Sequence, residues 1–195
     1  MKHLYLLLLA LNLTSCEFKE PLEVTQIISN EIVTLEDNYK DRSTTKDSVR
    51  ISIPLEFQIT MDSSVDYVVW LYRIDKKTLI DDAFDYEVYN KQNKTKQIFQ
   101  IDPDLANNKP INIIIKQMNY LISKKDAQKL LKKYNINKSL ENLKSGNTIK
   151  LINYDKFRNE NKTLINDFYK IPDSIHFKAM RGKKENFYVV KQINW

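Results

Sequence analysis

A serine and a histidine stand two residues apart in this chain, at Ser174 and His176. Nucleophilic catalysis would need the histidine to take the proton of the serine hydroxyl and a carboxylate to orient the imidazole ring. On a strand, side chains at this spacing point in parallel to the same face, which is poor geometry for proton transfer. The sequence also lacks the G-x-S-x-G elbow of many hydrolases. We therefore expect no catalytic residue, and we expect His176 on the solvent face of a strand whose other face carries Ile175, Phe177 and Ala179.

Four acidic residues, Asp81, Asp82, Asp85 and Glu87, lie close together and could offer oxygen ligands to calcium. Their spacing lacks the central glycine of an EF-hand loop, so the cluster is interpreted as a solvated turn. The two glycines of the chain, Gly146 and Gly182, lie far apart. Because a phosphate-cradling loop needs clustered glycines, a P-loop and a dinucleotide fingerprint are excluded. We expect no metal, no nucleotide and no other cofactor.

One amphipathic helix is predicted near residues 123–135. Ser123 and Asp126 have the spacing of a capping box at its start. The apolar positions of its face follow the period of an α-helix: Ala127, Leu130, Leu131 and Tyr134.

Lysines occupy the polar side of this helix, at Lys125, Lys129, Lys132 and Lys133. Such a row of charges is typical of a solvated helix face. As a contact surface, it would fit either anionic lipid or an acidic partner.

The chain begins with a short basic segment, Met1-Lys2-His3, and an apolar run over residues 4–13. A membrane-spanning helix needs about 20 apolar residues, so this run is too short to span. A basic start, a short apolar run and small residues before a cut are typical of a secretory signal peptide. Residues 1–15 are therefore predicted to be a signal peptide.

The segment Leu13-Thr14-Ser15-Cys16 resembles the lipobox of bacterial lipoproteins. The resemblance implies cleavage before Cys16, a diacylglycerol on its sulfur and acylation of the new amine. Two or three acyl chains anchor a protein stably, whereas one chain holds only marginally. With Cys16 acylated and His3 removed, no free thiol remains and His176 is the only histidine. A thiol nucleophile, a thiolate zinc site and a zinc site with two histidines are then excluded.

The resemblance implies a bacterial exported protein, anchored in the outer membrane and facing the periplasm or the cell surface. The many Lys, Asn and Ile residues resemble lipoproteins of Bacteroidota, in which acidic residues after the cysteine can direct surface display. Ser48 and Ser174 each follow an aspartate and precede an apolar residue, and so resemble the short O-glycosylation motif of that group. The formal charge of +6 falls to +5 without Lys2, which predicts envelope anions or proteins as partners and no nucleic acid.

Strand patterns dominate the rest of the chain. Residues 16–23 are predicted to be the lipidated cysteine and a tether, and residues 24–195 a single domain. The strands are expected at 49–53 and 55–59, 65–74, 84–89, 97–101, 111–115, 148–154, 175–180 and 186–193. Residues 24–37 and 163–170 fit either strand or helix. Pro54, inside a strand pattern, predicts an edge strand or a bulge.

These patterns predict a mainly β domain, an immunoglobulin-like antiparallel sandwich with one inserted helix near 123–135. Trp70 is expected in the core and Trp195, at the end of the chain, on the surface. The preferred function is a lipid-anchored, non-enzymatic module that binds another protein, either as an immunity protein or as an accessory subunit of an envelope complex. A glycan-binding lipoprotein and a hydrolase with an unrecognised carboxylate site are the alternatives.

Overall fold

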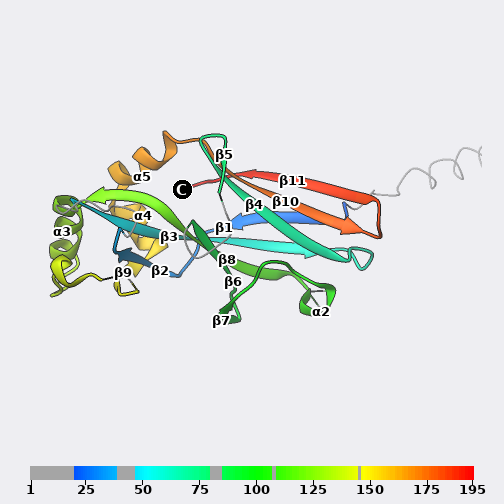
Figure 1. The fold of residues 1–195 in the computed structure, drawn as a ribbon, viewed down its shortest axis with the longest axis horizontal. Helices are drawn as coiled ribbons and strands as arrows, with labels where there is room; N and C mark the ends of the chain where they lie inside the picture. The colour runs from blue at the N-terminus through cyan, green and yellow to red at the C-terminus, as the bar shows by residue number, and fades with distance from the viewer. Residues whose placement is uncertain (1–19, 39–46, 80–84, 107–108, 145) are drawn as a thin grey trace, which may run out of the picture.

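A computed structural model describes residues 20–38, 47–79, 85–106, 109–144 and 146–195 (Figure 1). Cys16 and the predicted signal peptide lie outside the described residues. Among those described, no helix is both long and apolar enough to cross a membrane.

Two long antiparallel strands form the axis of the molecule. Strand β3 (Ser48–Met61) pairs with β8 (Ile111–Ser123), from Ser48 opposite Ser123 to Ile59 opposite Ile111. Fourteen residues at about 3.3 Å each make β3 roughly 45 Å long. The apolar residues Ile53, Leu55, Phe57 and Ile59 recur at every second position and are fully buried.

The other strands of this larger sheet, sheet A, extend the pair on both sides. The sheet order is β7 (Asn93–Gln97), β6 (Tyr86–Asn90), β8, β3, β2 (Ile32–Glu36) and β9 (Thr148–Asn153). Strand β1 (Leu22–Ile27) pairs with the second half of β3, beyond the stretch that β2 covers.

Pro54 lies where β3 passes from one neighbour to the other. Strand β2 pairs with residues 50–52 and β1 with residues 56–61, so residues 53–55 have no strand partner on that side among the described residues. The missing N–H of proline therefore costs no ladder hydrogen bond there. The pairing with β8 also shifts register between Ile51 and Ile53. The predicted irregularity is confirmed, but β3 is a central strand and the prediction of an edge strand is wrong.

A second sheet, sheet B, has the order β11 (Glu185–Gln192), β10 (Asp173–Arg181), β4 (Tyr67–Ile74) and β5 (Lys77–Thr78). It packs on the half of sheet A that contains β1, where Phe57 and Phe177 meet edge to face with centroids 5.5 Å apart. Trp70 is in this core, as predicted.

Helices cover the other half of sheet A (Figure 1). They are α3 (Lys124–Lys133), α4 (Tyr154–Glu160) and α5 (Lys162–Tyr169). The short 3₁₀ turn η1 (Leu140–Asn142) lies at the same end, beside Ser48 and Lys124, and the short α2 (Pro103–Ala106) lies elsewhere. Ser123 caps α3 as expected, because its hydroxyl accepts the N–H of Asp126. Asn153 caps α4 in the same way by accepting the N–H of Lys156.

The prediction of a mainly β, antiparallel domain with an amphipathic helix after residue 123 is confirmed. The prediction of a single helix is wrong, since residues 154–160 and 162–169 are helical too. Residues 24–37 contain the end of β1 and the whole of β2. The hairpin partner of β6 is β7, which ends at Gln97. Residues 98–101 do not continue it as a strand; Ile101 alone forms a bridge, to Val68.

Trp195 is buried, with 1 % of its surface exposed, so the prediction that it lies on the surface is wrong. Its ring meets Tyr120 edge to face at 5.1 Å and Phe168 at 5.5 Å. These rings belong to β8 and α5, so the chain end fills the junction between sheet B and the helical layer.

A buried carboxyl group lies at the same junction. Asp173, at the start of β10, accepts a hydrogen bond from the Tyr120 hydroxyl through Oδ2. Its Oδ1 has no partner among the described residues. Burial raises the pKa of Asp173 to about 6, although the Tyr120 hydrogen bond acts in the opposite direction. Burial and the nearby carboxylate raise the pKa of Tyr72 in turn.

Asp173 should therefore make the folded protein less stable as the pH rises from about 4 to about 6. In this window the native state binds more protons than the unfolded state, whose aspartate has the ordinary pKa of 3.8. We expect Asp173→Asn to unfold at a higher denaturant concentration than wild type at pH 7. We also expect the variant to lose this part of the pH dependence, measured by urea unfolding from pH 4 to 8. An identical pH slope in both proteins would contradict the assignment.

Candidate functional site

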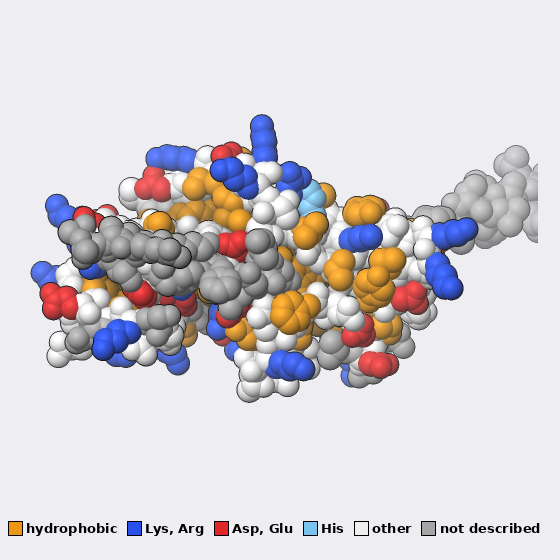
Figure 2. Space-filling model, in the orientation of Figure 1, with side chains coloured by type: hydrophobic (Ala, Val, Ile, Leu, Met, Phe, Trp, Pro, Cys, Tyr) orange, Lys and Arg blue, Asp and Glu red, His pale blue; other side chains and the backbone are white. Residues whose placement is uncertain are grey.

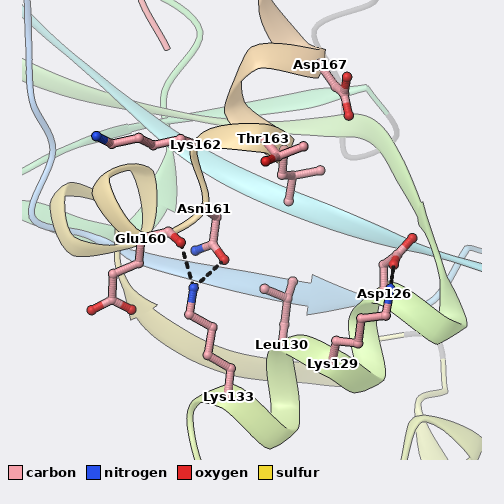
Figure 3. Close-up of a pocket in the computed structure, with 10 residues that line it drawn as sticks. Asp126, Lys129, Leu130, Lys133, Glu160, Asn161, Lys162, Thr163 and Asp167 are labelled. Atoms are coloured by element: carbon pink, nitrogen blue, oxygen red, sulfur yellow. Dashed lines mark hydrogen bonds and ion pairs between the residues drawn. The ribbon is translucent and has the colours of Figure 1, made fainter.

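A cleft of about 460 Å³ opens between α3 and the α4–α5 pair (Figure 3). We call it the helix cleft. It lies at the end of the molecule where β3 begins, since Ser48 pairs with Ser123 and α3 starts one residue later. The residues that line it are Asp126, Lys129, Leu130, Lys133, Glu160, Asn161, Lys162, Thr163, Leu164 and Asp167.

The apolar part of the helix cleft comes from two leucines. Leu130 belongs to the buried stripe of α3, with 7 % of its surface exposed. Leu164, near the start of α5, packs against the core but keeps some exposure. An incoming apolar side chain could bury surface against both leucines, and each methylene buried contributes about 0.8 kcal/mol.

Lys133 joins the two walls of the cleft. Its ammonium group donates to the carbonyl oxygen of Glu160 at 2.7 Å and to Oδ1 of Asn161 at 3.0 Å. Asn161 in turn donates to the hydroxyl of Tyr134 at 2.6 Å. Because the carbonyl end of a helix carries partial negative charge, the cation at the end of α4 is favourable.

The charges around the cleft are mixed. Lys129 forms an ion pair with Asp126 at 2.8 Å. The hydrogen bond from Lys129, and to a smaller extent the one from Ser123, lowers the pKa of the Asp126 carboxyl. Lys162 makes no hydrogen bond or ion pair with a described residue, while Asp167 pairs with Lys170 at 2.5 Å. Three lysines and three carboxylates therefore line the same cleft. Such a rim fits a protein surface that carries both charges better than it fits a uniformly anionic surface.

The four lysines singled out in the sequence divide into two pairs. Lys129 and Lys133 line the cleft, whereas Lys125 and Lys132 are exposed and do not. Sequence reasoning missed the opposite wall, which α4 and α5 supply. The signals for it were Asn153 at an N-cap position and the spacing of Leu164, Ile165 and Phe168.

The lining of the helix cleft is suited to binding. It contains no histidine, cysteine or serine, and its reactive groups are the Thr163 hydroxyl, three lysines and three carboxylates. In the described part of the chain, no three His, Cys, Asp or Glu side chains lie close enough to hold a metal ion.

Ser174 and His176 do make contact, with 3.2 Å between Oγ and Nε2. Ser174 is nearly buried, and His176 is half-buried, with Leu71 and Val190 as its cross-strand neighbours. Asp173 cannot complete a triad, because its carboxylate lies on the other face of β10 with Tyr120. Ile175, Phe177 and Ala179 are buried, as expected for that other face.

The remaining predicted positions are spread over the molecule. Ser48 is partly buried, and its hydroxyl accepts a hydrogen bond from Asn38 at 2.9 Å. Of the acidic cluster, Asp81 and Asp82 lie outside the described residues. Glu87 accepts a hydrogen bond from the hydroxyl of Tyr89 at 2.6 Å. Burial raises the pKa of Tyr89, and this hydrogen bond raises it further.

Replacing Lys133 by methionine should destabilise the protein, because it removes the two hydrogen bonds to the end of α4 while keeping the side-chain length. We expect a loss of about 1 kcal/mol in the free energy of unfolding, measured by urea denaturation. Lys132→Met is the matched control, since Lys132 is exposed on the same helix and lies outside the cleft; it should change stability little. Equal effects of the two substitutions would show that the hydrogen bonds of Lys133 to the end of α4 contribute nothing to the free energy of unfolding.

Comparison of the chain with protein-family models, with curated proteins and with solved structures found no match.

Proposed function

We propose that this protein is a lipid-anchored module of the bacterial outer membrane that binds another protein in its helix cleft, without catalysing a reaction. The observation that carries the proposal is the make-up of the cleft: two leucines within a rim of three lysines and three carboxylates. Protein interfaces combine an apolar centre with a polar rim in this way. An immunity protein and an accessory subunit of an envelope complex both fit the proposal.

The position of the cleft supports the same function. Leu22 pairs with Met61 at one end of β3, and Ser123, just before α3, pairs with Ser48 at the other end. The cleft therefore lies roughly 40 Å from the point where the chain joins the domain. Residues 17–21 span about 18 Å at most. An anchor on Cys16 would thus leave the cleft free to meet a partner.

The alternatives have less support. A glycan-binding surface would group exposed aromatic rings on one face. Within the described ranges, the exposed aromatic residues lie on separate elements: Phe99 before α2, Tyr169 at the end of α5 and Tyr188 on β11. A carboxylate-based hydrolase would need two carboxyl groups facing one substrate. In the helix cleft, Asp126 and Asp167 are instead paired with lysines.

We also propose that the half of the molecule formed by sheet B and the end of β3 is the immunoglobulin-like part of the fold. Two antiparallel sheets face each other there through Phe57 and Phe177. At the other end, helices take the place of the second sheet.

The cleft proposal predicts which substitutions abolish partner capture. A photo-crosslinking residue at Thr163, in the full-length lipidated protein in its own membranes, should capture one protein, identified by mass spectrometry. Leu164→Asp should reduce that capture at least tenfold, as expected for a residue at the centre of an interface, and Lys162→Glu on the rim should reduce it by a smaller factor.

Lys132→Glu is the matched control for this experiment and should leave capture unchanged. Thermal unfolding of each variant separates loss of binding from loss of fold. No protein captured at Thr163, or equal capture by all variants, would contradict a protein partner in the cleft.

The anchor is tested separately by Cys16→Ala. The wild-type protein should take up labelled fatty acid and stay with the membrane fraction, because two or three acyl chains hold a protein stably. The variant should take up no label and appear in the soluble fraction after cell disruption. A variant that still fractionates with the membrane would show that acylation of Cys16 is not what holds the protein there.

A further inference from the structure

The outer face of sheet B carries exposed apolar side chains. We use this name for the side chains of β4, β10 and β11 that point away from the core. They form four cross-strand rows: Tyr67–Met180–Asn186, Val69–Lys178–Tyr188, Leu71–His176–Val190 and Arg73–Ser174–Gln192. Leu71, Tyr188 and Val190 are 53 %, 66 % and 51 % exposed, and they are neighbours on this one face. In Figure 2 the pale blue histidine lies beside hydrophobic side chains.

This face is also cationic. None of the residues in its four rows is acidic, while Arg73 and Lys178 lie among the apolar side chains. The segments that form sheet B, residues 67–78 and 173–192, carry eight lysines and arginines but only three acidic residues, and one of these, Asp173, is buried. These segments therefore carry a net formal charge of +5, and Arg73 and Lys178 are the two basic residues that stand in the cross-strand rows of the outer face.

The charges on this face favour anionic lipid over a second copy of the chain as its binding partner. A second copy docked face to face would bring Arg73 and Lys178 against their own counterparts with no carboxylate from the face to pair with them. A surface of anionic lipid head groups has the complementary charge, and its boundary with the acyl chains accepts leucine, valine and tyrosine. The helix cleft differs in this respect, because carboxylates alternate with its lysines.

Sheet B also lies next to the point where the chain joins the domain. Arg181, at the end of β10, forms an ion pair with Asp62 at 3.4 Å, and the N–H of Asp62 donates to the carbonyl of Pro21 at 3.0 Å. In Figure 1 the turn between β10 and β11 lies at the same end of the molecule as the start of β1. An anchor a few residues before Pro21 would hold this face at a high effective concentration next to the membrane, so that a weak contact is sufficient.

We propose that the outer face of sheet B lies on the anionic lipid head groups of the membrane that anchors the protein. This inference rests on the proposed acylation of Cys16. The acyl chains hold the protein, and the sheet fixes its orientation, with the helix cleft at the far end of β3 free for a protein. The contact pairs Arg73 and Lys178 with lipid phosphates and inserts Leu71, Tyr188 and Val190 among the head groups.

The test uses the full-length lipidated protein in vesicles of phosphatidylcholine alone or of phosphatidylcholine with phosphatidylglycerol. With Cys16 acylated, a fluorophore can be placed uniquely at Val190→Cys, and Gln128→Cys, exposed on α3, serves as the control site. Spin-labelled lipids should quench the fluorophore at position 190 in the anionic vesicles, but not in the neutral vesicles and not at position 128. Tyr188→Cys provides a second label site if position 190 tolerates none.

Reversing the charge at Lys178→Glu should lower the population in contact about fivefold, whereas Lys132→Glu on α3 should leave it unchanged. Vesicle flotation separates the two proposals. A protein that floats but is unquenched at positions 188 and 190 is anchored without this contact, which overturns the inference. A protein that does not float is not anchored, and this result would contradict both the proposed acylation of Cys16 and the inference that rests on it. Quenching that is equal in neutral and anionic vesicles, and equal in wild type and Lys178→Glu, would overturn the inference. A protein crosslinked at position 190 in native membranes would also overturn it, because the face would then bind a protein.

Discussion

The continuous pairing of β3 with β8 is the constraint on which the rest of this structure depends. Each strand crosses the whole molecule, so one sheet supports two different covering layers, sheet B at one end and the helices at the other. Apolar side chains at alternate positions of β3 supply core for both layers. The length of this pair also separates the first strand, β1, from α3. The two surfaces proposed to bind are therefore far apart for a structural reason.

The two covering layers must be joined where they meet, and this is where the buried polar group lies. Asp173 connects β10 to β8 through the Tyr120 hydroxyl, and Trp195 packs on the same tyrosine from the chain end. A buried carboxyl group costs free energy unless it is hydrogen-bonded. A core of apolar side chains alone would avoid this cost. The tyrosine–carboxyl contact instead fixes one relative position of sheet B and the helical layer.

Much of this fold could be predicted from sequence, and the parts that could not have physical causes. The alternation in β3 and the capping box of α3 are local signals, and both are confirmed. The helices α4 and α5 are short, and their apolar residues are few, so their periodicity was weak against the strand patterns around them. Trp195 looked exposed because its burial depends on Tyr120 and Phe168, which are distant in sequence. Half of the predicted lysine surface lies at the cleft, but its other wall comes from residues 160–167, and no local pattern could place the two walls together.

The two surfaces proposed to bind differ in the chemistry that they offer. The helix cleft has mixed charges around two leucines, whereas the outer face of sheet B has cations among apolar side chains and no carboxylate in its four rows. The central claim is that the helix cleft meets a protein. The most direct measurement is the acetylation rate of individual lysines in the lipidated protein, compared by mass spectrometry between native membranes and the purified protein in detergent. Lys129 and Lys162 should react more slowly in native membranes, while Lys125 and Lys132 on the same end of the molecule should react equally in both. Equal rates for all four lysines would contradict the account.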